Sequence, residues 1–303
     1  MTLMIMKKKS RSGHASLLPE QIIELYRLAA TELPKDIEAG LRKALKSELS
    51  GTLAESAIAQ ILQNSDISKC ESVSLCQDTG TPIFYVSCPA GFSHTAIRKA
   101  ILAATKKATK EIPLRSNAVD TLSGKNTLDN TGEAFPVIHF EEWNKTYLKV
   151  DLLLKGGGSE NIGRTYSLPD IELNADRSIE GVRKCILDAV FRAQGMGCPP
   201  EVIGVAVGGS REVVSELSMR QLLRRIDDKN PNPRLDKFEK RMLQEANSLC
   251  IGPSGFGGNT TALAVKVAFT ARHVASYFVD VSFGCWALRR KTLVLKGGKA
   301  KYA

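Results

Sequence analysis

The stretch S-L-C-Q-D-T-G-T-P-I-F-Y-V, residues 74–86, places a thiol, an amide and a carboxylate in a turn directly before an apolar strand. Asp78 and Gly80 are turn formers, and residues 83–86 are strand formers. Cys76 is therefore expected on the connection that enters a buried strand. A side chain at such a place is held by the sheet and stays reachable, which suits binding or catalysis, although a turn of these residues can also be only a turn.

Outward from this stretch, helical and strand patterns alternate along the chain. Residues 19–64 show helical patterns with a break at Gly51, and residues 93–108 predict a helix capped by Ser93. The segments Y-L-K-V-D-L-L-L and E-V-I-G-V-A-V predict strands that end in glycine-rich turns. The sequence therefore predicts an α/β fold, with a helical N-terminal region followed by interleaved strands and helices in mixed sheets.

Length and composition are those of a globular protein. With 303 residues and 43% hydrophobic content, the chain can form one large domain or two lobes. We expect one domain over residues 16–295, with a possible lobe boundary near residue 150. No apolar run approaches the roughly 20 residues that span a bilayer, and the first charges follow the apolar residues, unlike a secretory signal. We expect a cytoplasmic protein without membrane contact.

The formal net charge of +10 is concentrated at the two ends of the chain. Residues 1–15 and 289–303 contain basic side chains and no acid, and the remainder is balanced. A folded nucleic-acid reader more often carries its basic patch on the body with stacking aromatic residues, and aromatic residues are only 6% here. We therefore expect solvated basic tails at 1–15 and 296–303, and contact of these tails with an acidic partner remains open.

Seven cysteines are scattered along the chain without a C-x-x-C pair, which argues against a disulfide framework and a zinc ribbon. Most are expected to be small buried residues, as Cys185 is in its helical pattern. Three differ because each lies among turn residues: Cys76 in L-C-Q-D-T-G, Cys198 in G-M-G-C-P-P and Cys285 in F-G-C-W-A. Three thiolates suit an iron-sulfur cluster with one iron open to a substrate oxygen, provided that the fold brings them together.

Five motifs in order carry a resemblance to a known family. They are C-Q-D-T-G, K-G-G-G-S-E-N, C-P-P followed by G-V-A-V-G-G-S, I-G-P-S-G-F-G-G-N-T-T, and A-R-H-x11-C-W-A. From about residue 20 to 295 the chain resembles the α subunit of the class I fumarate hydratase and L-tartrate dehydratase family. The resemblance implies an Fe-S hydro-lyase α-type catalytic domain whose 4Fe-4S cluster is held by Cys76, Cys198 and Cys285. It also implies a β subunit as partner, in a hetero-oligomer such as α2β2.

The resemblance further implies a pocket for a small dicarboxylate. Its binding residues are Gln77, Arg115 and Gly158, and its catalytic residues are Asp78 and His273. Arg115 offers a planar fork that suits a carboxylate, and a glycine run lets backbone N–H groups approach an anion. His273 can protonate a departing hydroxyl alongside Asp78. Without the resemblance, a surface arginine, a plain loop and a structural histidine are the ordinary interpretations.

The implied activity is the reversible hydration of fumarate to malate, a reaction of the tricarboxylic acid cycle. The chain alone is expected to be inactive, because no second domain follows its last strand pattern. The α subunit of an L-tartrate dehydratase or a mesaconate hydratase is the alternative, although K-G-G-G-S-E-N is nearer the fumarase version. From another class, a non-enzymatic protein that binds nucleic acid through its basic tails is the second alternative.

Overall fold

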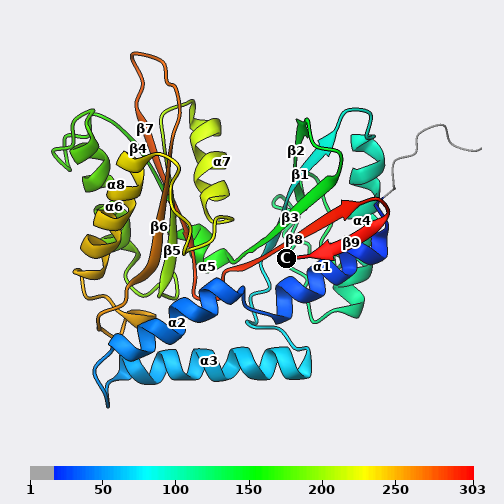
Figure 1. The fold of residues 1–303 in the computed structure, drawn as a ribbon, viewed down its shortest axis with the longest axis horizontal. Helices are drawn as coiled ribbons and strands as arrows, with labels where there is room; N and C mark the ends of the chain where they lie inside the picture. The colour runs from blue at the N-terminus through cyan, green and yellow to red at the C-terminus, as the bar shows by residue number, and fades with distance from the viewer. Residues whose placement is uncertain (1–16) are drawn as a thin grey trace, which may run out of the picture.

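The computed structural model describes residues 17–303, so the expected tail at 1–15 lies outside the described residues. The strands are β1 (Thr81–Pro89), β2 (Val137–Trp143), β3 (Leu148–Lys155), β4 (Arg164–Ser167), β5 (Glu201–Val207), β6 (Ala262–Phe269), β7 (Phe278–Gly284), β8 (Arg289–Lys296) and β9 (Lys299–Tyr302). They form two sheets that stand side by side, in the orders β2-β1-β3-β8-β9 and β4-β7-β5-β6 (Figure 1). Each sheet combines one parallel pair with antiparallel pairs, which confirms the predicted mixed α/β architecture.

Helices surround both sheets. They are α1 (Pro19–Thr31), α2 (Lys35–Ser47), α3 (Leu53–Glu71), α4 (His94–Glu111), α5 (Gly157–Asn161), α6 (Ile179–Ala193), α7 (Arg211–Gln221) and α8 (Pro233–Asn247), with a 3-10 turn at Pro253–Gly255. The helical N-terminal region is as predicted, and Gly51, with φ of +80°, lies in the break before α3. Ser93 caps α4 as expected, because its hydroxyl accepts a hydrogen bond from the Ala96 N–H at 3.2 Å.

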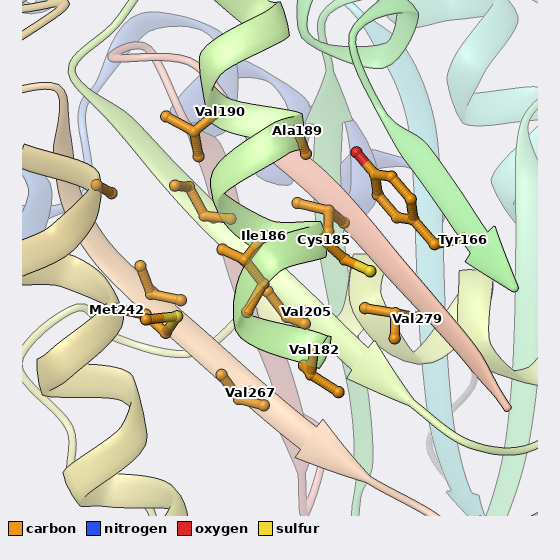
Figure 2. Close-up of a cluster of buried hydrophobic side chains, with 14 of the residues drawn as sticks. Tyr166, Val182, Cys185, Ile186, Ala189, Val190, Val205, Met242, Val267 and Val279 are labelled. Carbon is orange, nitrogen blue, oxygen red and sulfur yellow. The ribbon is translucent and has the colours of Figure 1, made fainter. Parts of the chain in front are cut away.

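The two sheets have separate cores. Helices α1 and α4 cover the first sheet, while α6 and α8 cover one face of the second sheet and α7 covers its other face (Figure 1). Figure 2 shows the core of the second sheet, where Cys185 lies among Val182, Val205 and Val279. Cys185 is fully buried there, as its helical pattern predicts.

A third core joins the sheets. Helices α2 and α3 run beneath both of them (Figure 1), and their apolar side chains pack with Leu153 of β3 and with Val202 of β5. The chain enters the second sheet after β3 and returns to the first at β8. The lobe boundary near residue 150 stays a prediction. This shared core fixes the junction between the sheets, where the site described below lies.

The C-terminal segment is a paired strand where a basic tail was expected. Much of the expected tail at 296–303 is strand β9, which forms an antiparallel hairpin with β8. Its lysines are exposed, as expected. Just before it, Leu293 and Leu295 alternate into the core of the first sheet, and only 1% of Arg289 and 8% of Arg290 are exposed.

No helix within residues 17–303 combines the length and the apolar character that crossing a membrane requires.

Candidate active site

Strand register brings the loops of the site together in two pairs. In the first sheet Thr81 pairs with Lys155, so the Cys76 loop before β1 lies beside the glycine run after β3. In the second sheet Val202 pairs with Gly284, so the Cys198 loop before β5 lies beside the Cys285 loop after β7. Antiparallel pairing therefore explains why distant motifs meet at the strand ends.

The Cys285 loop joins the two pairs, because it runs from β7 of the second sheet to β8 of the first. In the register of β3 and β8, Leu154 pairs with Arg289, one position from the end of β3. The return of the chain to the first sheet thus occurs beside the glycine run. All four loops meet at the junction between the sheets, above the shared core.

Asp78 fastens the Cys76 loop to the glycine run. Its Oδ1 accepts a hydrogen bond from the Gly80 N–H at 3.0 Å, and its Oδ2 accepts one from the Gly157 N–H at 2.7 Å. Gly80 has φ of +82°, and a Cβ there would lie 2.8 Å from the backbone of Leu154, so only glycine fits. The carboxylate is therefore held in one orientation at the mouth of the site.

The Cys198 loop is fixed to its neighbours by backbone hydrogen bonds. The Trp286 N–H donates to the Cys198 carbonyl at 3.1 Å, and the Ser254 N–H donates to the Pro199 carbonyl at 2.8 Å. The second bond places the I-G-P-S-G-F-G-G turn against the Cys198 loop. The loop has little freedom to move away from Cys285.

The three loop thiols lie within electrostatic reach of one another. Burial raises the pKa of Cys285 to about 11, the charge of Arg289 opposes that rise, and the Cys198 and Cys76 thiols add to it. Burial likewise raises the pKa of Cys198, with Cys76 as the next cause. All three thiols are free. A soft, cationic iron centre would stabilise their thiolate forms, so this donor set fits an iron-sulfur group.

No three His, Cys, Asp or Glu side chains among residues 17–303 are arranged around a single metal ion. A cluster has a different requirement, because each thiolate binds its own iron and the sulfurs stay farther apart.

Of the other four cysteines, two are buried and two are exposed. Cys88 and Cys185 are buried, as expected, but Cys70 and Cys250 are exposed. The expectation that most cysteines are buried is wrong for the last two. Cys70 lies near the exposed end of α3, and Cys250 lies in the turn after α8, where φ is +53°.

The structure brings the three predicted binding residues to the rim of this junction. Gln77 and Gly158 are exposed on the paired loops of the first sheet. The Arg115 side chain is exposed, and its backbone N–H donates to the Thr79 hydroxyl at 3.0 Å, one residue from Asp78. The Asn130 amide donates to the Arg115 carbonyl at 2.9 Å. The arginine therefore projects from a fixed backbone beside the site.

His273 is not brought to the thiols within one chain. It lies in the loop after β6, exposed, with its Nδ1 accepting a hydrogen bond from the Ala275 N–H at 3.1 Å. Because β5 and β6 are parallel, this loop lies at the opposite end of the sheet from Cys198. A strand of seven residues such as β5 spans about 20 Å. The catalytic assignment of His273 stays a prediction.

Two buried ionisable residues of the junction were given no role by the sequence. Lys155 is 3% exposed, and its Nζ donates to the Ser159 hydroxyl at 3.1 Å and to Glu160 at 3.0 Å. Glu201 is fully buried against Gly197, where a Cβ would lie 2.0 Å from its carboxylate. Neither carboxylate oxygen of Glu201 has a hydrogen-bond partner. The sequence did contain one sign of this buried carboxylate, because Glu201 is the first residue of an otherwise apolar strand.

Glu201 predicts a specific dependence of stability on pH. Burial raises its pKa to about 8, against the opposing charge of Lys155. Between the ordinary glutamate pKa and about 8 the folded chain holds a proton that the unfolded chain has lost, so the free energy of unfolding falls as pH rises through that window. In wild type this fall in the free energy of unfolding is on the order of a few kcal/mol, and Glu201→Gln is expected to abolish it. Urea unfolding of metal-free proteins at pH 5, 7 and 9 measures it.

Glu172, which is exposed on a loop, supplies the control for this experiment. Glu172→Gln is expected to follow the wild-type pH profile. An unchanged profile in Glu201→Gln would show that the Glu201 carboxyl ionises normally in the folded chain.

Comparison with known proteins supports one family. The family model described as fumarate hydratase (Fumerase) matches residues 19–294. A protein of Geobacillus stearothermophilus assigned as a class I fumarate hydratase is 45% identical over 278 residues, which cover 90% of this chain and 54% of that protein. The chain thus spans about half the length of this relative.

Two shorter relatives are matched almost end to end. A Methanocaldococcus jannaschii protein assigned as the alpha subunit of an L(+)-tartrate dehydratase is 34% identical, over 90% of this chain and 95% of that protein. The L(+)-tartrate dehydratase alpha subunit of Escherichia coli is 30% identical, over 96% of this chain and 95% of that protein. Because the family model and these relatives cover nearly all of the chain outside its first residues, the chain belongs to the fumarate hydratase (Fumerase) family.

Proposed function

We propose that the chain is the α subunit of an iron-sulfur hydro-lyase that interconverts fumarate and malate. One observation carries the proposal: three free thiols on three separate loops converge where Asp78 is fastened to a glycine run. Its assignment to fumarate is supported by the relative of highest identity among those described above, which is assigned as a fumarate hydratase.

Cys76, Cys198 and Cys285 would hold a 4Fe-4S cluster. When bound, a cluster with three thiolate ligands supplies an open iron that acts as a Lewis acid toward a substrate oxygen. The free thiols and the two unpartnered nitrogens of buried Arg289 support this assignment, because an anionic group on that side would satisfy both.

Side chains of the rim would bind and orient the substrate. Arg115 would bind one carboxylate through its planar fork, and Gly158 lets the other end of a small dicarboxylate approach the backbone without a side chain in the way. Gln77 would donate its amide to a substrate oxygen. Asp78 would hold or accept the proton, because each of its oxygens accepts one backbone hydrogen bond and keeps a second lone pair.

A separate β subunit would complete the enzyme. Two relatives of similar length are named alpha subunits, and the Geobacillus relative is nearly twice as long as the region that matches. Exposure of Cys198, Gln77 and Arg115 supports a partner that covers this side. A hetero-oligomer such as α2β2 is the assembly that we propose.

Tartrate is the second candidate substrate. Tartrate is favoured by the extent of the match, because the two tartrate dehydratase alpha subunits align with this chain over nearly their whole length. Tartrate carries an additional hydroxyl compared with malate, so the two substrates present different hydrogen-bonding groups to the same rim.

One assay tests substrate and partner together. The chain is loaded with iron and sulfide anaerobically, and turnover of fumarate, L-tartrate and mesaconate is measured with and without its candidate β subunit. We expect a brown protein that is inactive alone and hydrates fumarate in the complex. Turnover by the chain alone rules out the need for a partner, preference for tartrate moves the assignment to the second candidate, and failure to take up iron rules out the cluster.

A further inference from the structure

Arg289 is a buried cation that forms no ion pair with any carboxylate of the part of the chain that the structure describes. It begins β8, is 1% exposed and has the largest of the fully buried side chains. Burial of an ionised group is costly unless hydrogen bonds and an opposite charge compensate it. No ion pair of Arg289 with a carboxylate occurs within residues 17–303. A further anion in contact with the guanidinium would complete the compensation of this charge.

The hydrogen bonds of Arg289 are also incomplete. A guanidinium has five N–H donors, and here one nitrogen, Nη1, donates to the Asp78 carbonyl. Both Nε and Nη2 are buried without a partner. A Cβ at Gly156 would lie 3.4 Å from Nη2 and 3.1 Å from Asp78 Oδ2, so the unpartnered side of the guanidinium lies against the glycine run of the site.

The neighbouring arginine, Arg290, has an anionic partner, although its Nη1 is also buried without a hydrogen-bond partner. Arg290 is also buried, but it forms an ion pair with Asp36 and donates to the Leu223 carbonyl. Successive residues of a strand point to opposite faces, so Arg289 and Arg290 serve different sides of β8. Of the two arginines, only Arg290 forms an ion pair within residues 17–303.

A thiolate is an anion that can accept the hydrogen bonds of the unpartnered Arg289 nitrogens. Arg289 follows Cys285 by four residues and begins β8, on the connection that carries this thiol. Sulfur accepts charge-assisted hydrogen bonds, and donors to the sulfurs of a metal site orient its ligands and tune its affinity. Arg289 therefore stands between the Asp78 loop and the Cys285 thiol.

We infer that Arg289 is the positioning residue of the iron-sulfur site, which rests on the proposed function. Through Nη1 it holds the Asp78 loop, and through Nε and Nη2 it donates hydrogen bonds to the sulfur of the anionic thiolate-bound cluster. Its single positive charge offsets one negative charge of the thiolate-bound cluster, and its hydrogen bonds tie the Asp78 loop to the Cys285 loop. Its role is to retain the cluster, whereas Arg115 at the rim binds substrate.

Three variants test this inference: Arg289→Gln, Arg289→Lys and the matched control Arg290→Gln. Each is loaded with iron under anaerobic conditions, and iron per chain, the visible circular dichroism and the rate of iron release to a chelator are measured. We expect Arg289→Gln to release iron about 10 to 100 times faster than wild type, as for other residues that orient metal ligands. Arg289→Lys keeps the charge without the fork and is expected to be intermediate.

The control separates a role at the cluster from a role in folding. Arg290→Gln leaves Asp36 unpaired and is expected to lower the melting temperature of the metal-free chain, while its iron-release rate and visible spectrum stay those of wild type. If Arg289→Gln does not fold, the same measurements on Arg289→Lys test the inference in its place. Faster release in Arg290→Gln than in Arg289→Lys would overturn the inference.

Two further results would overturn it and differ from failure of the proposed function. If wild type holds iron and Arg289→Gln releases it at the wild-type rate with an unchanged spectrum, the inference is wrong and the cluster assignment stands. The same holds if Arg289→Gln keeps its iron and only loses substrate affinity. If wild type takes up no iron, the proposed function fails and the inference fails with it.

Discussion

Serine at any one of the three loop cysteines is expected to abolish stable iron binding. These positions are Cys76, Cys198 and Cys285. A serine hydroxyl is a much weaker acid than a thiol and offers a hard oxygen in place of a soft sulfur, so the remaining two thiolates hold the iron poorly. Iron content and visible absorption after anaerobic reconstitution measure the loss. Full iron retention in any one variant excludes that cysteine as a ligand.

The remaining four cysteines are the matched controls. Cys70→Ser and Cys250→Ser place a hydroxyl in solvent, and Cys88→Ala and Cys185→Ala avoid an unpaired hydroxyl in the core. All four are expected to bind iron like wild type. Because Cys185 is packed among branched side chains, its alanine variant is expected to lose some thermal stability while its iron content is unchanged.

Arg115→Ala is expected to keep the cluster and lose most turnover. Loss of a charge-assisted pair with a substrate carboxylate costs on the order of 2 to 4 kcal/mol of transition-state binding, or about 30- to 1,000-fold in kcat/KM. Steady-state kinetics of the iron-loaded complex measure this. Arg42→Ala is the control, since Arg42 is exposed on α2 and forms an ion pair with Glu38. Similar kinetics in both variants would remove Arg115 from the pocket.

Local patterns in the sequence predicted the elements that carry the site. The Ser93 cap, the break at Gly51 and the helix of Cys185 follow from hydrogen bonding and periodicity within a few residues. The loop position of Cys76 before β1 follows from turn formers that meet strand formers. Each of these features depends on its neighbours in the chain, so the sequence contains the information directly.

The convergence of the loops could be expected only from the resemblance. Cys198 and Cys285 meet because β5 and β7 pair with a particular antiparallel register, which no local pattern reveals. The same limit explains His273, whose motif leads to Cys285 although β7 separates the two residues by the length of the sheet. The catalytic assignment of His273 stays a prediction.

Burial of charge was the other feature hidden from the sequence. Nothing in the local sequence distinguished Arg289 from the basic residues that follow it, and Glu201 was given no role. Both are buried because strands β8 and β5 lie in the interior of their sheets, with neighbours on both sides. Strand order decides this, and strand order is a property of the whole fold.

The passage of the chain out of the first sheet and back again has a kinetic consequence. The segments that carry Cys76, Cys198 and Cys285 are separated by whole sheet strands and helices, so the thiols meet only after both sheets have formed and docked through their shared core. Contacts between distant segments form late because their loop-closure entropy must be overcome first. Under the proposed function, iron delivery would therefore be a step that follows folding, and the thiols of a newly made chain would stay unprotected until then.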